Sequence, residues 1–267
     1  MTALQAACEA GNEKIIDILL QEGAEINADG GGLIGKSALA AASGAGHFGI
    51  VKKLLDLGAD INQLGHKVYG YTALSAAVEQ GDFDLVDYLV QRGAGVQAKH
   101  GFMALKSAIS RDRVDVTSRL LKLGANVNAE VDGEAPVHVV CSVEMLNLLV
   151  AHGAQVNRPS FHPYGCTALQ GAAKHGNLDL VKELIRLGSD IHAPGPEIRG
   201  RTALQSAASA YPDGLPIIKL LIDEYGADVN EARSSEEGYT SLEAACHLTA
   251  TWYADTQDLS LVEFLLE

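Results

Sequence analysis

The sequence has few aromatic residues, few prolines and few cysteines. Phe, Trp and Tyr make up 5% of the 267 residues, and seven prolines and four cysteines occur. The cysteines, Cys8, Cys141, Cys166 and Cys246, are widely spaced, and none forms a Cys-x-x-Cys pair. Because no secretion signal is recognisable either, this usage excludes a disulfide-rich secreted scaffold. We expect an intracellular protein, cytoplasmic, nuclear or both.

Long apolar runs and an excess of basic residues are also missing. No run approaches the roughly 18 apolar residues that cross a bilayer, so no membrane partner is expected. The formal net charge is −14, whereas affinity for phosphates comes from clustered Lys and Arg. The composition therefore argues against direct nucleic-acid binding and favours basic partners.

One short motif is repeated along the whole chain. Thr-Ala-Leu begins at Thr2, Thr72, Thr167 and Thr202, with variants at Ser37, Met103, Ala135 and Thr240. Successive copies are 35, 35, 31, 32, 32, 35 and 38 residues apart. A period in the low thirties is typical of a helical solenoid, in which each unit packs on its neighbours.

Each unit predicts two helices and a connecting finger. Thr or Ser is a good N-cap for the first helix, because its hydroxyl accepts a hydrogen bond from the first turn. Glycines are expected to end the first helix at Gly11, Gly46, Gly81 and Gly176. A second amphipathic helix is expected to end at Gly23, Gly58, Gly93, Gly124, Gly153, Gly188 and Gly226. Ala-Asp-Val-Asn or a variant then leads into the finger.

This pattern is similar to the ankyrin repeat over essentially the whole chain. The resemblance implies an all-α solenoid of about eight helix-turn-helix units with β-hairpin-like fingers, as a single domain, residues 1–267. The expected units are 1–29, 30–64, 65–98, 99–129, 130–157, 158–193, 194–231 and 232–267. The family's His survives only at His138, and Ala replaces its Pro almost throughout. We expect both departures to loosen the hydrogen bonds between repeats.

Several units depart from the regular pattern. Long fingers are expected at 30–36, 65–71 and 158–166, and short ones before Met103 and Ala135. Unit five loses three residues at its inter-helix turn, and unit seven gains a turn with two prolines, which interrupts its helices. The first unit begins at its cap and the last ends within its second helix. Incomplete terminal repeats of this kind suggest end-to-end contacts or a longer protein.

Motifs for catalysis, metals or cofactors are weak. Gly30-x4-Gly35-Lys36-Ser37 matches a phosphate-binding loop, but no strand is expected before it and Ser37 is explained as a cap. The nine histidines occupy unrelated repeat positions, which disfavours a metal site. Cys8, Cys141 and Cys246 share one helix position and are expected to pack inside, whereas Cys166 is expected to be exposed in a finger. We expect no catalytic, cofactor or metal residues.

The candidate partner-binding residues lie where neighbouring units differ. In the ankyrin family the fingers and first helices line a concave surface that binds proteins. The residues at this place in the present sequence are Tyr69, Tyr71, Phe102, Phe161, Tyr164, Arg201 and Tyr239. Tyr and Arg are enriched in interface hot spots. Tyr69 and Tyr164 equally fit a role in stiffening adjacent fingers.

The resemblance implies a non-catalytic interaction module with a protein partner. The long fingers look like arrays of filamentous fungi. That likeness suggests a regulatory protein, such as a transcription coregulator or an adaptor. The alternative is the recognition segment of a larger nucleotide-binding immune-type receptor. An enzyme or a direct nucleic-acid binder would need clustered titratable or basic residues, which the sequence does not show.

Overall fold

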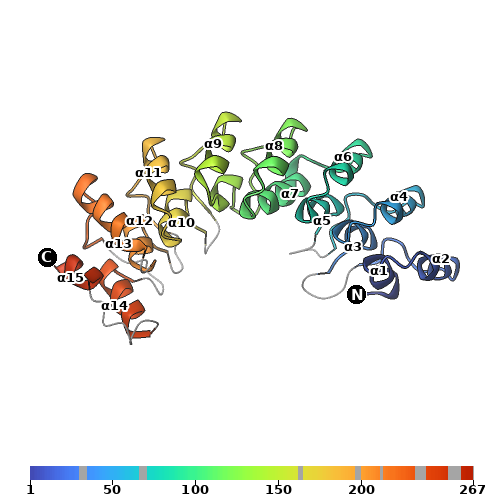
Figure 1. The fold of residues 1–267 in the computed structure, drawn as a ribbon, viewed down its shortest axis with the longest axis horizontal. Coiled ribbons are helices and arrows are strands. Elements are labelled where there is room, and N and C mark those ends of the chain that lie inside the picture. The colour runs from blue at the N-terminus through green and yellow to red at the C-terminus, as the bar shows by residue number, and fades with distance from the viewer. Residues whose placement is uncertain are drawn as a thin grey trace. The chain divides into compact units, whose positions relative to one another are not determined.

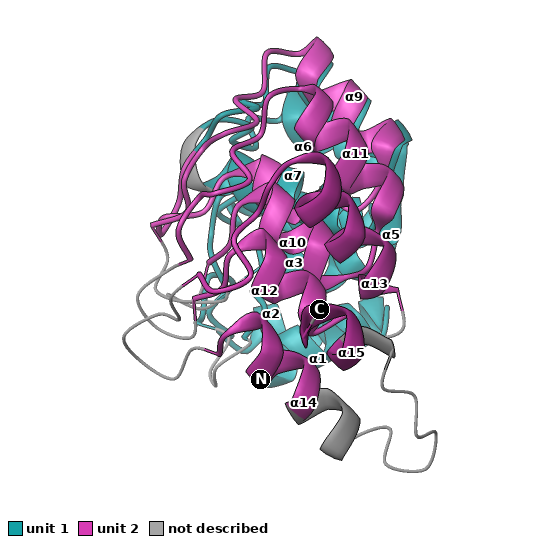
Figure 2. Cartoon of the chain, turned by 90° about the vertical axis from the view of Figure 1, so that its left-hand side faces the viewer, with its two compact units in different colours: residues 1–129 teal, residues 130–267 magenta. Residues whose placement is uncertain are grey.

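The chain folds into two compact units, residues 1–129 and 130–267 (Figure 2). The computed structural model describes residues 1–29, 35–65, 71–161, 165–195, 200–210, 213–231, 239–251 and 260–266. Within these ranges the regular structure is helical, which confirms the predicted class. Two isolated bridges take the place of strands there, a parallel one between Lys36 and Tyr71 and an antiparallel one between Val131 and Glu134.

The first unit is built from four helix pairs. Its helices are α1 (Ala3–Glu9), α2 (Glu13–Gln21), α3 (Ala38–Gly44), α4 (Phe48–Asp56), α5 (Ala73–Gln80), α6 (Phe83–Gln91), α7 (Ala98–Ser110) and α8 (Val114–Lys122). The first helices α1, α3, α5 and α7 pack side by side (Figure 1). Each second helix packs against the first helix of its own pair.

The second unit follows the same scheme with more irregular elements. They are η1 (Pro136–Val139), α9 (Val143–Ala151), α10 (Ala168–Lys174), α11 (Leu178–Arg186), α12 (Ala203–Ala208), α13 (Gly214–Lys219), η2 (Leu220–Glu224), α14 (Ser241–Thr251) and α15 (Ser260–Leu266). The first elements η1, α10, α12 and α14 pack successively, and α13 continues into η2, a single π-helical turn. In the seventh repeat α12 ends at Ala208 and α13 begins at Gly214, so the helices are interrupted as expected, although Pro216 lies inside the first turn of α13.

The helix ends follow the sequence signals. The hydroxyls of Thr2, Ser37, Thr72, Thr167 and Thr202 each accept the backbone N–H three residues later. The glycines that were expected at helix ends all have positive φ. Asp112 takes the same place between α7 and α8 with φ 54°, so here an aspartate adopts the left-handed conformation that suits glycine best.

Two repeats, residues 99–129 and 130–157, differ from the expected helix–turn–helix pattern. Helix α7 begins at Ala98 rather than at Met103, so no short finger precedes Met103. Met103 has no side-chain acceptor for a free N–H, and nothing there stops the helix from extending towards the N-terminus. In the repeat of residues 130–157 the first helix is only the 3₁₀ segment η1. The turn after it is shortened, and Val140 already has extended backbone, so only four residues are helical.

The cores of both units contain the repeated leucine and the small residues around it. Six of the seven leucines of the motif are buried, namely Leu4, Leu39, Leu74, Leu105, Leu169 and Leu204, and Leu242 is half buried. Cys8 is fully buried, as predicted, but Cys141 and Cys246 are exposed. The packing role predicted for those two cysteines is therefore wrong. None of the helices in the described ranges combines the length and hydropathy that a membrane span requires.

Glutamine takes over the hydrogen bonds expected of the family histidine. Gln170 Oε1 accepts the Thr167 N–H at 2.9 Å, and its Nε2 donates to the carbonyls of Ala193 and Pro194 at 2.9 and 3.2 Å. Gln5 and Gln205 make the equivalent bonds to their own caps and to the loop that leads into the following repeat. The expectation that replacing His loosens the contacts between repeats is thus wrong wherever Gln stands.

Candidate functional site

The residues directly before the cap positions from Ser37 onwards are partly exposed in all but one repeat. We call these residues the pre-cap row: Lys36, Tyr71, Phe102, Glu134, Cys166, Arg201 and Tyr239. Their neighbours are the residues seven positions after each cap. Lys36 Nζ lies 3.1 Å from Glu9 Oε1, and Arg201 donates to Ser209. The two rows together form the candidate surface in each unit.

In the first unit the candidate surface is centred on Tyr71. Its hydroxyl hydrogen-bonds to Glu79, and burial together with that carboxylate raises its pKa, although Arg111 and Lys36 act against the shift. Glu79 also accepts from Ser107 Oγ at 3.0 Å and lies 3.2 Å from Arg111 Nη2. Tyr71 is therefore held in one orientation with its ring half exposed, which suits a rigid aromatic contact.

Phe102 does not lie on this surface. The ring is only 3% exposed, and Lys106 Nζ lies 5.9 Å from its centroid. The sequence placed Phe102 in a finger, but the N-terminal extension of α7 turns this position into a helical one that packs inside the unit. We therefore remove Phe102 from the candidate surface.

In the second unit the candidate surface contains an arginine next to an aromatic ring. The guanidinium carbon of Arg201 lies 5.6 Å from the centroid of Tyr239, and Nη1 donates to Ser209 Oγ at 2.6 Å. Ser209 Oγ in turn donates to the Ser206 carbonyl at 2.7 Å. Burial lowers the pKa of Arg201. The two candidates Arg201 and Tyr239 are thus brought together, although 38 residues separate them in the chain.

The remaining candidates belong to the fingers. Phe161 is 70% exposed, and its N–H donates to the Gly133 carbonyl at 3.0 Å. That bond ties the backbone of its finger to the preceding one. Tyr69 and Tyr164 lie outside the described residues.

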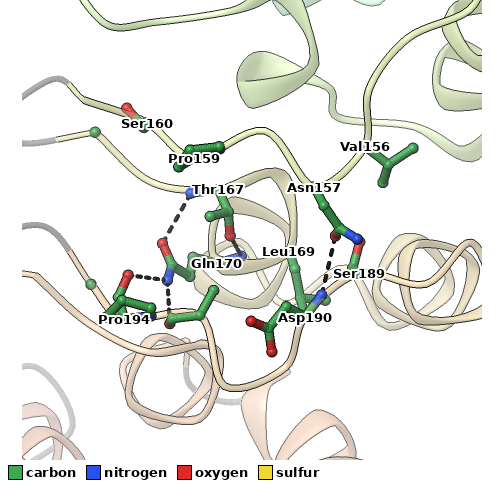
Figure 3. A pocket seen from close by; sticks show the side chains of 13 residues that line it. Val156, Asn157, Pro159, Ser160, Thr167, Leu169, Gln170, Ser189, Asp190 and Pro194 are labelled. Carbon is green, nitrogen blue, oxygen red and sulfur yellow. Dashed lines mark hydrogen bonds between the residues drawn. The ribbon is translucent and has the colours of Figure 1, made fainter.

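A cavity that the sequence did not predict lies between two loops of the second unit. It measures about 510 Å³ and is bounded by the loops that follow α9 and α11 and by the start of α10 (Figure 3). Asn157 and Gln170 on its wall already bridge the repeats, Asn157 through Asp190 N–H at 3.1 Å. The hydroxyl of Ser189 is buried without a hydrogen-bond partner among the described residues. Only the contact between two repeats creates this space, so no local signal marks it.

Groups suited to metal binding are not assembled in the described ranges. Three or more His, Cys, Asp or Glu side chains in metal-binding geometry do not occur there. Burial raises the pKa of the Cys8 thiol to about 11 and also raises that of Cys166, which is half buried rather than exposed. Both thiols are thereby held in the protonated form, which is a poor nucleophile.

Comparison with known proteins is consistent with this architecture. A family model described as ankyrin repeats in three copies matches residues 1–65, 63–131, 127–195 and 169–267. The crystal structure of the human ASB11 ankyrin repeat domain superposes with a TM-score of 0.61 at 24% identity. It covers 85% of this chain and 100% of that one.

Two curated relatives are similar over a shorter stretch. Protein phosphatase 1 regulatory subunit 27 of Mus musculus is 38% identical over 78 residues, which are 29% of this chain and 47% of the relative. The Homo sapiens protein of the same name is 39% identical over 74 residues, 28% of this chain and 45% of that one. The chain thus spans about half the length of these relatives.

Proposed function

Because this chain belongs to the ankyrin-repeat family, we propose that it is a non-catalytic interaction module that binds a protein partner on its pre-cap rows and fingers. Such arrays stack similar units and leave their non-repeating surface residues for recognition. The proposal names Tyr71, Phe161, Arg201 and Tyr239, together with Tyr69 and Tyr164. It leaves out the buried Phe102.

The observation that carries this proposal is the contrast between neighbouring positions. Six of the eight cap positions carry Thr or Ser, and the motif leucine recurs in seven of the eight repeats, because capping and packing favour the same chemistry each time. The pre-cap row changes from Lys36 to Tyr71, Cys166 and Arg201, and apart from Phe102 its members stay partly exposed. Variation at exposed positions on a constant scaffold is what partner recognition requires.

A regulatory role is the finer proposal. Its support is the name of the curated relatives, which are regulatory subunits. Within that role we propose a coregulator or an adaptor in the cytoplasm or nucleus. The alternative, a recognition segment of a larger nucleotide-binding receptor, differs in requiring a nucleotide-binding domain in the same polypeptide. Sequencing the full transcript distinguishes the two.

The test is a binding experiment with matched variants. The tagged chain is used to isolate partners, which mass spectrometry identifies, and the affinity for a purified partner is measured by calorimetry. We expect the triple variant Tyr71→Ala, Arg201→Ala, Tyr239→Ala to weaken binding at least about tenfold, since such residues often dominate interfaces. Circular dichroism checks that the variant remains folded.

The control variant carries three substitutions on the second helices, Lys52→Ala, Glu144→Ala and Lys182→Ala, all at exposed positions. It is expected to bind like the unmodified chain. Undiminished binding by the first variant combined with loss in the control would place the interface on the opposite face and refute the proposal.

A further inference from the structure

Arg201 differs from the other described arginines in its partners. Six arginines lie within 4 Å of a carboxylate, in the pairs Arg92–Asp56, Arg111–Glu79, Arg113–Asp115, Arg119–Asp87, Arg158–Glu130 and Arg186–Glu183. Arg201 has no such carboxylate among the described residues; its contacts are Ser209 and the ring of Tyr239. This difference needs an explanation, because half-buried charges are usually paired.

The guanidinium of Arg201 is nevertheless held in place. Ser209 Oγ donates its own proton to the Ser206 carbonyl, so its lone pair points at Arg201 Nη1, 2.6 Å away. The ring of Tyr239 supports the guanidinium. Among the described residues, one of its five N–H groups has an acceptor, at Ser209, so the guanidinium has capacity for a further acceptor. Burial lowers the pKa of Arg201, as expected for a cation that has lost part of its hydration.

A second cation occupies a related position in the same unit. In the first unit, the residue seven places after one cap pairs with the pre-cap residue of the next repeat, as Glu9 and Lys36 do at 3.1 Å. The equivalent positions in the second unit are Lys174 and Arg201. Lys174 is exposed and takes part in none of the ion pairs of the described residues. The first pair of positions thus combines a negative and a positive charge, whereas the second pair carries two positive charges.

We propose that Arg201 is the binding site for an aspartate or glutamate side chain of the protein partner. The ring of Tyr239 supports the guanidinium from one side, and Lys174 supplies a second positive charge at the equivalent position of the preceding repeat. The inference rests on the proposed function of this face and specifies what is recognised there. A carboxylate would form the forked ion pair that Arg201 lacks, and such pairs are the stronger class of hydrogen bond.

The net charge of −14 does not prevent this recognition. At physiological ionic strength, exposed charges more than about 8 Å apart are largely screened from one another. A partner carboxylate against Arg201 is therefore largely screened from acidic residues farther away than this. A half-buried guanidinium also gains more from an incoming anion than an exposed one does, because less water has to be displaced from it.

The test uses a peptide library displayed on phage and panned against the whole chain. We expect selected peptides to carry Asp or Glu at one common position. Changing that residue to Asn or Gln in a synthetic peptide should weaken binding about 10-fold or more, as loss of a charge-assisted bond does. The R201Q variant should lose a similar factor, and the peptide change should have no further effect on R201Q. R201K should recover part of the affinity.

The matched control is R186Q, which removes an arginine already paired with Glu183 on an exposed helix. It should bind the peptides like the unmodified chain. Peptides that require Tyr71 or Tyr239 but show no acidic preference would overturn this inference and leave the proposed function standing. Failure to select any peptide that depends on Tyr71, Arg201 or Tyr239 would overturn both. A purely structural role for Arg201 would instead appear as a lowered melting temperature of R201Q with unchanged peptide affinity.

Discussion

His138 and the glutamines that replace it perform the same task with different atoms. His138 Nδ1 accepts the Ala135 N–H at 3.1 Å, and Nε2 lies 2.9 Å from the Arg158 carbonyl. These two bonds require the tautomer with the proton on Nε2. The amide of Gln170 offers one acceptor and one donor at matching places. The substitution is thus conservative in its hydrogen bonds, but only histidine can be protonated near neutral pH.

We predict that His138 makes the stability of the second unit depend on pH. Burial lowers its pKa below the ordinary value of 6.5, so the unfolded chain binds the proton more readily than the folded chain. The stabilising contribution is complete above about pH 6.5 and is lost as the pH falls through the lower folded pKa. Urea unfolding between pH 8 and pH 5 should show this loss, and it should be reduced in H138Q.

The comparison of the unmodified chain with H138Q assigns the pH dependence to His138, because every other titrating group is present in both. An unchanged pH slope in H138Q would show that His138 is not the group responsible.

At the scale of single elements, the ends of helices are determined by neighbouring residues in the chain. Thr72 caps α5 through a bond to Ser75 N–H, and Gly81 ends that helix with φ 78°. Both interactions span at most a few residues, which is why the sequence predicted them. The start of α7 at Ala98 follows the same logic, because Met103 lacks a capping side chain. That displacement was readable from the sequence, but its consequence, the burial of Phe102, was not.

Two glycines of one repeat should respond in opposite ways to alanine. Gly171 lies inside α10, and an added methyl group would meet Cys166 Sγ at 3.5 Å and the His138 carbonyl at 3.7 Å, which are ordinary contacts. We expect Gly171→Ala to stabilise by about 0.5–1 kcal/mol through helix propensity. Gly188 has φ 85° with nothing within 4 Å of the added methyl group, so Gly188→Ala should cost about 1 kcal/mol through backbone strain alone.

Urea unfolding of the two variants measures both effects on the same background. Destabilisation by Gly171→Ala would mean that α10 and η1 are packed too tightly to accept one methyl group.

At the scale of the molecule, the chain forms two compact units, residues 1–129 and 130–267. Within each unit the successive first elements pack on one another, and α1, α3, α5, α7, α10 and α12 each also pack on their own second helix. In a repeat array, a destabilising substitution is expected to affect a given repeat less as more repeat–repeat interfaces lie between the two.

We predict that Leu74→Ala loosens the first unit while the second stays protected. Leu74 is 1% exposed in α5, and removing a buried leucine side chain costs about 2–5 kcal/mol. Hydrogen exchange followed by mass spectrometry should show faster exchange in α3, α5 and α7 and unchanged exchange in α10 and α12. The control is Gln80→Ala, an exposed position of the same helix. Equal loss of protection in both units would contradict independent stability.

The sequence by itself determined the helical class, the repeated caps and turns, and the buried leucines. These features depend on interactions within about four residues and on a period that returns in every unit. The tertiary structure decided which of the similar positions are exposed. Cys8 is buried whereas Cys141 and Cys246 are exposed, and Phe102 is buried whereas Arg201 is half exposed.

The physical reason is distance along the chain. Gln170 reaches carbonyls 23 and 24 residues away, and Arg201 rests on a ring from the following repeat. Whether a charge finds a carboxylate depends on side chains about one repeat away, as in the pair of Arg119 with Asp87, 32 residues apart. No local pattern encodes that outcome. That Arg201 has no carboxylate partner among the described residues could therefore be found only from the packing of neighbouring repeats.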